Sequence, residues 1–107
     1  MSKVVTRRPA ARRDIVTHYV YLAENAGEDV AERFIINLES SLTMLADQSG
    51  LGAPLQLRPS ALQGLRKWRL PQFENVLIVY KPRQDGISLV RVFHTAQDWW
   101  RLLDVET

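Results

Sequence analysis

The feature that most constrains the fold is a change in the spacing of apolar residues near the middle of the chain. Between residues 9 and 47, apolar side chains recur every three or four positions, which is the spacing of one face of an α-helix. Between residues 65 and 94 they alternate or form short apolar runs, which is typical of β-strands. The segment 49–64 is rich in Gly, Pro and Ser and has no period, so we expect a crossing loop there. The sequence therefore predicts an α+β fold.

The helical half predicts two helices joined by a very short link. The first, over residues 9–26, has a proline in its first turn, where a missing backbone N–H breaks no helical hydrogen bond. Gly27 follows and supplies the left-handed conformation that ends many helices. The second helix, over residues 28–47, opens with Glu28 and Asp29, which interact favourably with the helix dipole. A link this short predicts an antiparallel hairpin whose apolar faces share one core.

The strand half predicts a small, mostly antiparallel sheet on which the helical hairpin packs. The central strand is expected at residues 75–81, because NVLIVYK is apolar nearly throughout, as in a strand covered on both faces. A hairpin turn is expected at 82–86, since the stretch ends in the common turn pair Asp-Gly. The other expected elements are a first strand at 4–6, strands at 65–70 and 87–94, and a short C-terminal helix at 97–103. The predicted order is β-α-α-β-β-β.

Length and composition restrict the domain organisation and the available chemistry. At 107 residues the chain has room for one domain, 1–107, with a single core. The absence of cysteine excludes thiol catalysis and disulfides, and two histidines, His18 and His94, do not make a metal site by themselves. We therefore expect no metal and no other cofactor. No apolar run reaches the roughly 18 residues of a membrane-spanning helix, so we expect a soluble, cytoplasmic protein without a membrane partner.

Charged residues are distributed unevenly along the chain. From Arg58 to Arg91 there are seven basic residues and two acidic ones, whereas Glu24 to Asp47 contains six acids and one base. The net charge of +2 therefore conceals a basic side. Such a side suits a phosphate backbone or an acidic protein partner equally well, and a solvated face without a partner is the ordinary alternative.

The order of elements, together with several local motifs, resembles the ParE branch of the RelE/ParE toxin superfamily. The motifs are Pro-Ala-Ala at the start of the first helix, Gly-Glu-Asp followed by Ala-Glu-Arg-Phe after the helical link, and Arg-Val-Phe-His at the end of the last strand. Their order and spacing over about residues 5–103 carry the resemblance. It implies a helical hairpin packed on a small sheet. One departure is Arg8, which stands where such chains usually have a helix-capping serine.

The resemblance implies a toxin of a type II toxin-antitoxin pair. ParE-type members are similar to poisons of DNA gyrase, and RelE-type relatives cut messenger RNA on the ribosome. The expected partners are a cognate antitoxin and DNA gyrase, with operator DNA reached only through the antitoxin. The expected function is growth inhibition by binding and poisoning gyrase. A ribosome-dependent mRNA endonuclease and a non-toxic remnant that only binds its antitoxin are the alternatives.

The nuclease alternative makes demands on particular side chains. Cleavage by a 2′-hydroxyl needs a base, an acid and positive charge on the phosphate. The residues that could serve are Lys67, Arg69, Arg91 and His94. However, Leu77 occupies the position where RelE-like enzymes carry an arginine, and their C-terminal tyrosine is missing from the matching stretch. We therefore expect no catalytic residues and a function by binding.

Three further expectations concern side chains that titrate. His94 is expected to be a hydrogen-bonded structural histidine, since alternation places it on the same face as Val90 and Val92. His18 is expected to be exposed on the first helix. Tyr80, at the end of the central strand, is expected in the core with its hydroxyl satisfied.

The antitoxin is predicted to bind the basic side of the first strand after the loop. An acidic, flexible segment that folds on binding would follow charged surface and fill apolar notches between helix and sheet. The expected contact residues are Arg66, Lys67, Trp68 and Arg69.

The target is predicted to bind near the C-terminus, at Trp99, Trp100 and Arg101. Adjacent helical positions point about 100° apart, so one indole can close the core while the other remains at the surface. An exposed tryptophan beside an arginine resembles an interface hot spot. Packing of both rings over the helical hairpin is the alternative.

Overall fold

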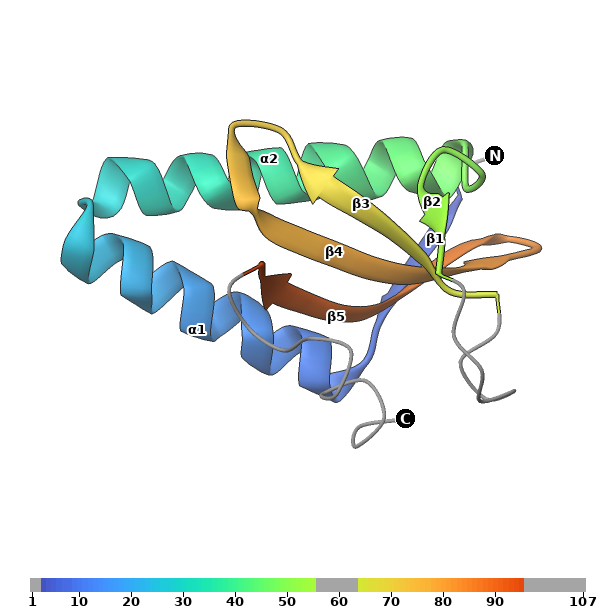
Figure 1. Ribbon diagram of the computed structural model, residues 1–107, viewed down its shortest axis with the longest axis horizontal. Helices are drawn as coiled ribbons and strands as arrows, with labels where there is room; N and C mark the ends of the chain where they lie inside the picture. The colour runs from blue at the N-terminus through green and yellow to red at the C-terminus, as the bar shows by residue number, and fades with distance from the viewer. Residues whose placement is uncertain (1–2, 56–63, 96–107) are drawn as a thin grey trace.

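The computed structural model describes residues 3–55 and 64–95 (Figure 1). The elements in chain order are β1 (Val4–Arg7), α1 (Pro9–Asn25), α2 (Glu28–Asp47), β2 (Ala53–Pro54), β3 (Arg66–Leu70), β4 (Phe73–Arg83) and β5 (Gly86–His94). The predicted α+β fold is confirmed, and the ends of the predicted elements agree with the observed ones to within two residues. The exception is β2, which lies in the segment predicted to be a loop. The expected helix at 97–103 lies outside the described residues.

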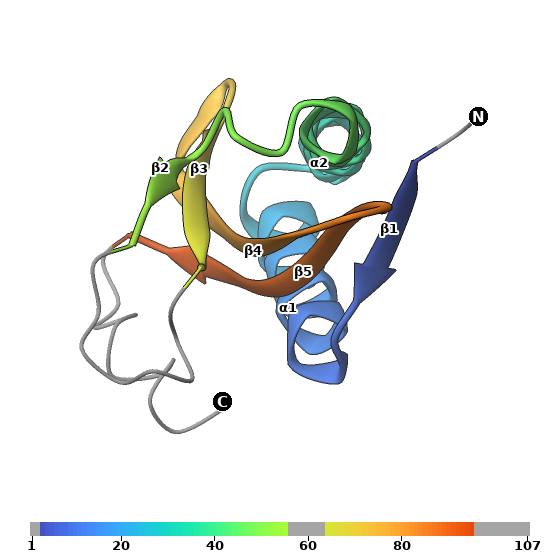
Figure 2. The same cartoon turned by 90° about the vertical axis from the view of Figure 1, so that its right-hand side faces the viewer.

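The five strands form one mixed sheet in the order β1-β5-β4-β3-β2. Strand β4 is the central strand, as predicted, and its pairing with β3 and β5 is antiparallel. The first strand of the chain pairs in parallel with the last described one, with Val4 opposite Gly86 and Arg7 opposite Leu89 (Figure 2). A side chain at position 86 would collide with the Val4 backbone, so this pairing requires glycine.

The helical hairpin packs on one face of the sheet, and the main core lies between them (Figure 2). Alternation along the strands separates the residues that face the helices from those on the opposite face. The helix-facing core contains Phe34, Leu38, Leu42 and Leu45 of α2, Ala11 of α1, and Leu70, Val76, Ile78, Tyr80, Ile87, Leu89 and Val92 of the sheet. A smaller buried cluster on the other face contains Leu65, Leu77, Val79, Val90 and Phe93.

The predicted five-residue turn between the last two strands is wrong in length. The observed turn contains only Gln84 and Asp85, and Pro82 is part of β4. A proline inside a strand is tolerated where its missing N–H faces an unpaired edge. Pro82 meets this condition because the pairing of β4 with β3 ends at Tyr80, with Arg66 as its partner.

The segment predicted as an irregular loop contains β2 because the Tyr80 hydroxyl organises the chain around it. This hydroxyl donates to the Ser49 carbonyl at 2.7 Å and accepts from the Gly52 N–H at 2.8 Å. Tyr80 is fully buried, so the prediction of a core tyrosine with a satisfied hydroxyl is confirmed. Burial raises the pKa of this phenol above its usual 10.0.

Candidate functional site: the outer strand β3 and the open edge of β5

Strand β3 presents its four predicted antitoxin contacts on two faces. Trp68 packs against the helix-facing core, whereas Lys67 and Arg69 pair with Val79 and Leu77 on the opposite face. A groove of about 490 Å³ runs along this part of the sheet. Its lining residues are Leu51, Ala53, Lys67, Trp68, Arg69, Leu77 and Thr95. The groove therefore combines apolar walls with two basic side chains, which suits an extended segment that carries acidic residues.

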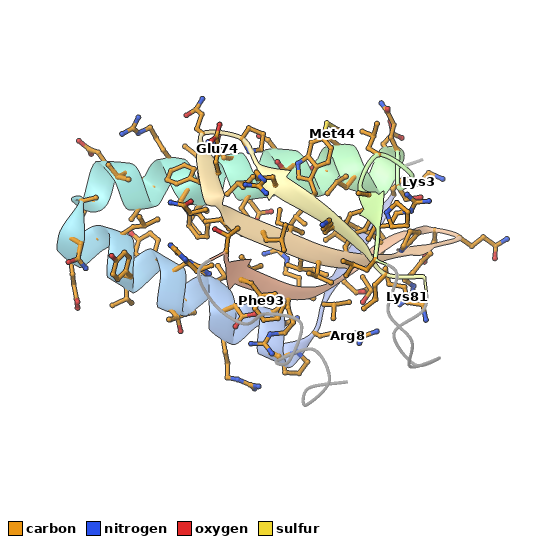
Figure 3. The ribbon with its side chains drawn as sticks, in the orientation of Figure 1. Lys3, Arg8, Met44, Glu74, Lys81 and Phe93 are labelled. Carbon is orange, nitrogen blue, oxygen red and sulfur yellow. The ribbon has the colours of Figure 1, made fainter. Side chains whose placement is uncertain are left out.

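The fourth residue of this set, Arg66, serves the local structure. Its guanidinium donates to the Gly52 carbonyl at 2.5 Å and to the Gly50 carbonyl at 3.3 Å. It thus holds the loop that leads into β2. Arg69 bonds more loosely, at 3.3 Å to the carbonyl of Glu74, the second residue of β4 (Figure 3). Lys67 and Arg69 line the groove, whereas Arg66 does not, so these two side chains are the better placed to meet an acidic partner in it.

Strand β5 extends beyond the end of β1, and side chains of α1 cover this unpaired part of its edge. Strand β1 ends at Arg7, and the next backbone N–H, that of Arg8, still donates to the Leu89 carbonyl at 3.0 Å. Beyond it, Asp14 accepts from the Val92 N–H at 2.9 Å. As predicted from the missing serine, the Arg8 side chain does not cap α1. Helix α1 therefore replaces β1 as the hydrogen-bonding neighbour of β5.

Asp14 also forms a nearly buried ion pair with Arg91. The Arg91 Nε and Nη2 donate to the two carboxylate oxygens at 2.7 and 3.0 Å. The guanidinium carbon lies 4.6 Å from the centre of the Phe93 ring. Both side chains are 15% exposed or less, so this ion pair has a structural role, and it joins α1 to the sheet.

The prediction that His18 is exposed is wrong. Its ring is half-buried, with its centroid 5.8 Å from that of Phe34, and its Nε2 lies 3.2 Å from the Val92 carbonyl. Burial lowers the pKa of His18 below its usual 6.5, although the bond to Val92 and the charge of Asp14 oppose this. His18 and Asp14 are four residues apart, so one face of α1 contacts both the N–H and the carbonyl oxygen of Val92.

The prediction that His94 shares a face with both Val90 and Val92 is half wrong. Val79 pairs with Arg91 but its neighbour Tyr80 pairs with Leu89, which leaves Val90 as the extra residue of a β-bulge. Val90 therefore belongs to the far cluster and Val92 to the helix-facing core. His94 lies two residues after Val92 and therefore on the same face of β5. It lines a cavity of about 340 Å³ on the helical side, together with Asp14, Thr17, His18, Tyr21 and Val92.

The four residues of the nuclease alternative are divided by the sheet. Lys67 and Arg69 lie along the groove on β3, whereas His94 opens into the cavity beside α1. The Arg91 side chain is engaged by Asp14. Among the described residues, no cluster of three His, Asp or Glu could hold a metal ion.

A comparison with protein families identifies the chain. The model of the family described as the ParE toxin of type II toxin-antitoxin system, parDE, matches residues 5–99. The chain belongs to the ParE toxin family. Eleven chains of solved structures also match, among them the chromosomal ParDE TA system from P. aeruginosa. That match has a TM-score of 0.68 at 17% identity and covers 88% of this chain and 95% of that one. At this identity it shows the fold alone.

No curated protein matches this ParE-family chain. In the described ranges, neither helix is long and apolar enough to cross a membrane. The predicted target residues of this ParE toxin, Trp99, Trp100 and Arg101, lie outside the described part of the chain.

Sequence reasoning missed Asp14, the residue that fixes Arg91 and the β5 edge. The available signal was the four-residue spacing of Asp14 and His18, which places them on one helical face.

Proposed function

We propose that this ParE-family toxin inhibits growth by binding and poisoning DNA gyrase, and that a cognate antitoxin neutralises it. Membership of the family of type II toxins supports the class of function. The antitoxin would be the only link between the toxin and operator DNA. The proposal needs no reaction catalysed by the toxin itself.

One observation favours a binding mechanism over RNA cleavage. In-line cleavage requires the base, the acid and the phosphate-binding cations around one scissile bond. Here His94 lies on the helical side, while Lys67 and Arg69 lie on the other face of the sheet, with β4 between β3 and β5. The geometry of the described residues thus gives a nuclease no common site for these groups.

Paired assays of His94→Gln distinguish a gyrase poison from a nuclease. The variant should inhibit growth nearly as well as the parent chain, because a binding toxin needs no proton transfer at His94. The two measurements are supercoiling by purified gyrase with added toxin and mapping of mRNA ends in induced cells. Codon-phased mRNA cuts that disappear in His94→Gln, with supercoiling unaffected, would replace this proposal by the nuclease alternative.

A truncation before Trp99 tests the proposed target-binding residues. Loss of both tryptophans and Arg101 should abolish gyrase inhibition, because aromatic and arginine side chains carry most of the free energy of many interfaces. Antitoxin binding serves as the folding control, since it uses β3. A truncated chain that binds antitoxin and still inhibits gyrase would exclude the C-terminal residues as the target contact.

The β3 groove is the proposed antitoxin site, and charge reversal tests it. Lys67→Glu combined with Arg69→Glu should weaken the antitoxin complex by about tenfold or more, because two basic side chains that line the groove become acidic. The matched control is Lys81→Glu with Arg83→Glu, which changes the net charge equally at the exposed far end of β4. Equal affinities of the two double variants in a titration would contradict the proposed groove.

A further inference from the structure

Helix α1 carries apolar residues on two sides. Ala11, Ile15 and Leu22 pack in or against the helix-facing core. On the outer side, Val16 is 62% exposed and Val20 is 45% exposed. Single exposed valines need no explanation, but these two are neighbours four residues apart on one line of the helix surface.

The same line of α1 continues with charged residues at both ends. Arg12 precedes Val16 by four residues, and Glu24 follows Val20 by four. All four side chains are exposed. The outer face of α1 is therefore a stripe of one cation, two valines and one anion at equal spacing, which we call the α1 stripe. Such a row of residues four apart forms the ridge through which helices commonly pack.

The two charges of the α1 stripe are misplaced with respect to their own helix. The N-terminal end of a helix favours negative charge and the C-terminal end favours positive charge. Helix α1 has no acidic residue in its first turn and no basic residue in its last turn. Instead Arg12 lies near the first end and Glu24 lies in the last turn. Neither charge is explained by the stability of the isolated helix.

We propose that the α1 stripe is an interface between two copies of this chain. If two α1 helices pack antiparallel about a two-fold axis, Arg12 meets Glu24 of the other copy and Val16 meets Val20 of the other copy. Each charge then also lies beside the favourable end of the neighbouring helix dipole. The stripe is its own complement, which is the property a two-fold interface requires.

The sequence of charges favours a second copy over another occupant. An acidic antitoxin segment laid along the stripe would meet the carboxylate of Glu24, and like charges that face each other reduce affinity. The stripe is also remote from the β3 groove, because α1 packs on β5 and β4 separates β5 from β3 (Figure 2). Self-association is therefore compatible with antitoxin binding and does not depend on gyrase being the target.

The proposed dimer is weak. One helical stripe with two valines buries far less surface than a standard interface, so the dimer dissociates at low concentration. Sedimentation equilibrium of the purified chain from about 10 µM to about 1 mM covers the range expected for such small contacts. The dimer fraction should rise across this range and should fall when salt is added, because the end charges are screened.

Charge exchange gives the decisive experiment. Arg12→Glu and Glu24→Arg should each weaken self-association about tenfold, because two exposed attractive pairs become repulsive. An equimolar mixture of these two variants should recover the parent affinity, since every facing pair is again of opposite sign. The double variant Arg12→Glu/Glu24→Arg should recover it as well. Arg33→Glu, an equal charge change at an exposed position of α2, should leave it unchanged.

Three results would overturn the proposal. The first is a parent chain that remains monomeric at the highest concentration. The second is a pair of single variants that weaken association while the mixture and the double variant fail to restore it, given circular dichroism spectra of folded protein. The third is an Arg12→Glu variant that loses antitoxin affinity but associates like the parent chain, because the stripe would then belong to the antitoxin.

Discussion

Among single residues, Asp14 matters most for the contact between α1 and the sheet, because its carboxylate bonds both a side chain and a backbone group of β5. It accepts three hydrogen bonds, two from the Arg91 guanidinium and one from the Val92 N–H. Both donor residues, Arg91 and Val92, are buried. The free energy of the fold therefore depends on the charge of one helix side chain that contacts no proposed partner.

Asp14→Asn should lower the free energy of unfolding by about 3–5 kcal/mol, because it leaves the buried guanidinium of Arg91 without its counter-charge. Urea unfolding followed by circular dichroism measures this loss. Asp85→Asn is the control, since it removes an exposed carboxylate 3.6 Å from Arg83 and should cost less than about 1 kcal/mol. Equal losses in the two variants would contradict the structural role of Asp14.

His18 should make the stability depend on pH. Because burial lowers its pKa in the folded chain, the unfolded chain binds the proton more readily below about pH 6.5. The free energy of unfolding should therefore be highest above pH 6.5 and fall as the pH drops toward the folded pKa, by at most about 1.4 kcal/mol per pH unit for one proton. His18→Gln should remove this contribution. Parallel pH profiles of the variant and the parent chain would show that His18 titrates alike in both states.

At the scale of elements, the junction of β1 and β5 depends on one residue without a side chain. Gly86→Ala should lower the free energy of unfolding by more than about 2 kcal/mol, because the added methyl group would collide with the backbone of Val4. Gly50→Ala is the matched control, since a methyl group there meets no atom within 4 Å. A thermal melt of each variant makes the comparison. Similar melting temperatures would mean that β1 can shift away at little cost.

The elements were predictable from the sequence because each depends on a local pattern. The helices at 9–26 and 28–47 and the central strand at 75–81 follow from apolar spacing alone, and the separation of Trp68 and Leu70 from Lys67 and Arg69 follows from alternation. The predictions that were wrong concern features that depend on contacts between residues distant in sequence. The bulge at Val90 shifts the alternation of β5, and no residue type at this position indicates a bulge.

The candidate site was predictable only in part for the same reason. The basic residues of β3 were found by type, but their division into the structural Arg66 and the groove-lining Lys67 and Arg69 depends on the loop at Gly50 and Gly52. The burial of His18 depends on Val92, which is 74 positions away. Such partners are fixed by the packing of α1 on β5 and leave no local trace.

At the scale of the whole molecule, the two proposed surfaces lie on different elements. Strand β4 lies between β3, which carries the groove, and β5, on which α1 packs (Figure 1). A complex of antitoxin and toxin should therefore still self-associate through α1. Sedimentation of the purified complex should show a further association step that Glu24→Arg removes and Arg33→Glu leaves in place. A complex in which antitoxin blocks this step would place the antitoxin over α1.

The parallel pairing of β1 with β5 governs when the chain acquires its structure during synthesis. Val4 leaves the ribosome among the first residues, but its partner Gly86 is made only after most of the chain, so at about 5–20 residues per second β1 waits several seconds. Helix α1 likewise lacks the β5 edge on which it packs until that moment. Stalled nascent chains should be digested by protease until β5 has cleared the exit tunnel and should resist it afterwards. In an unfinished chain, β1 and α1 thus lack the strand on which both of them pack, and any surface of the folded toxin that includes them forms only once β5 has been made.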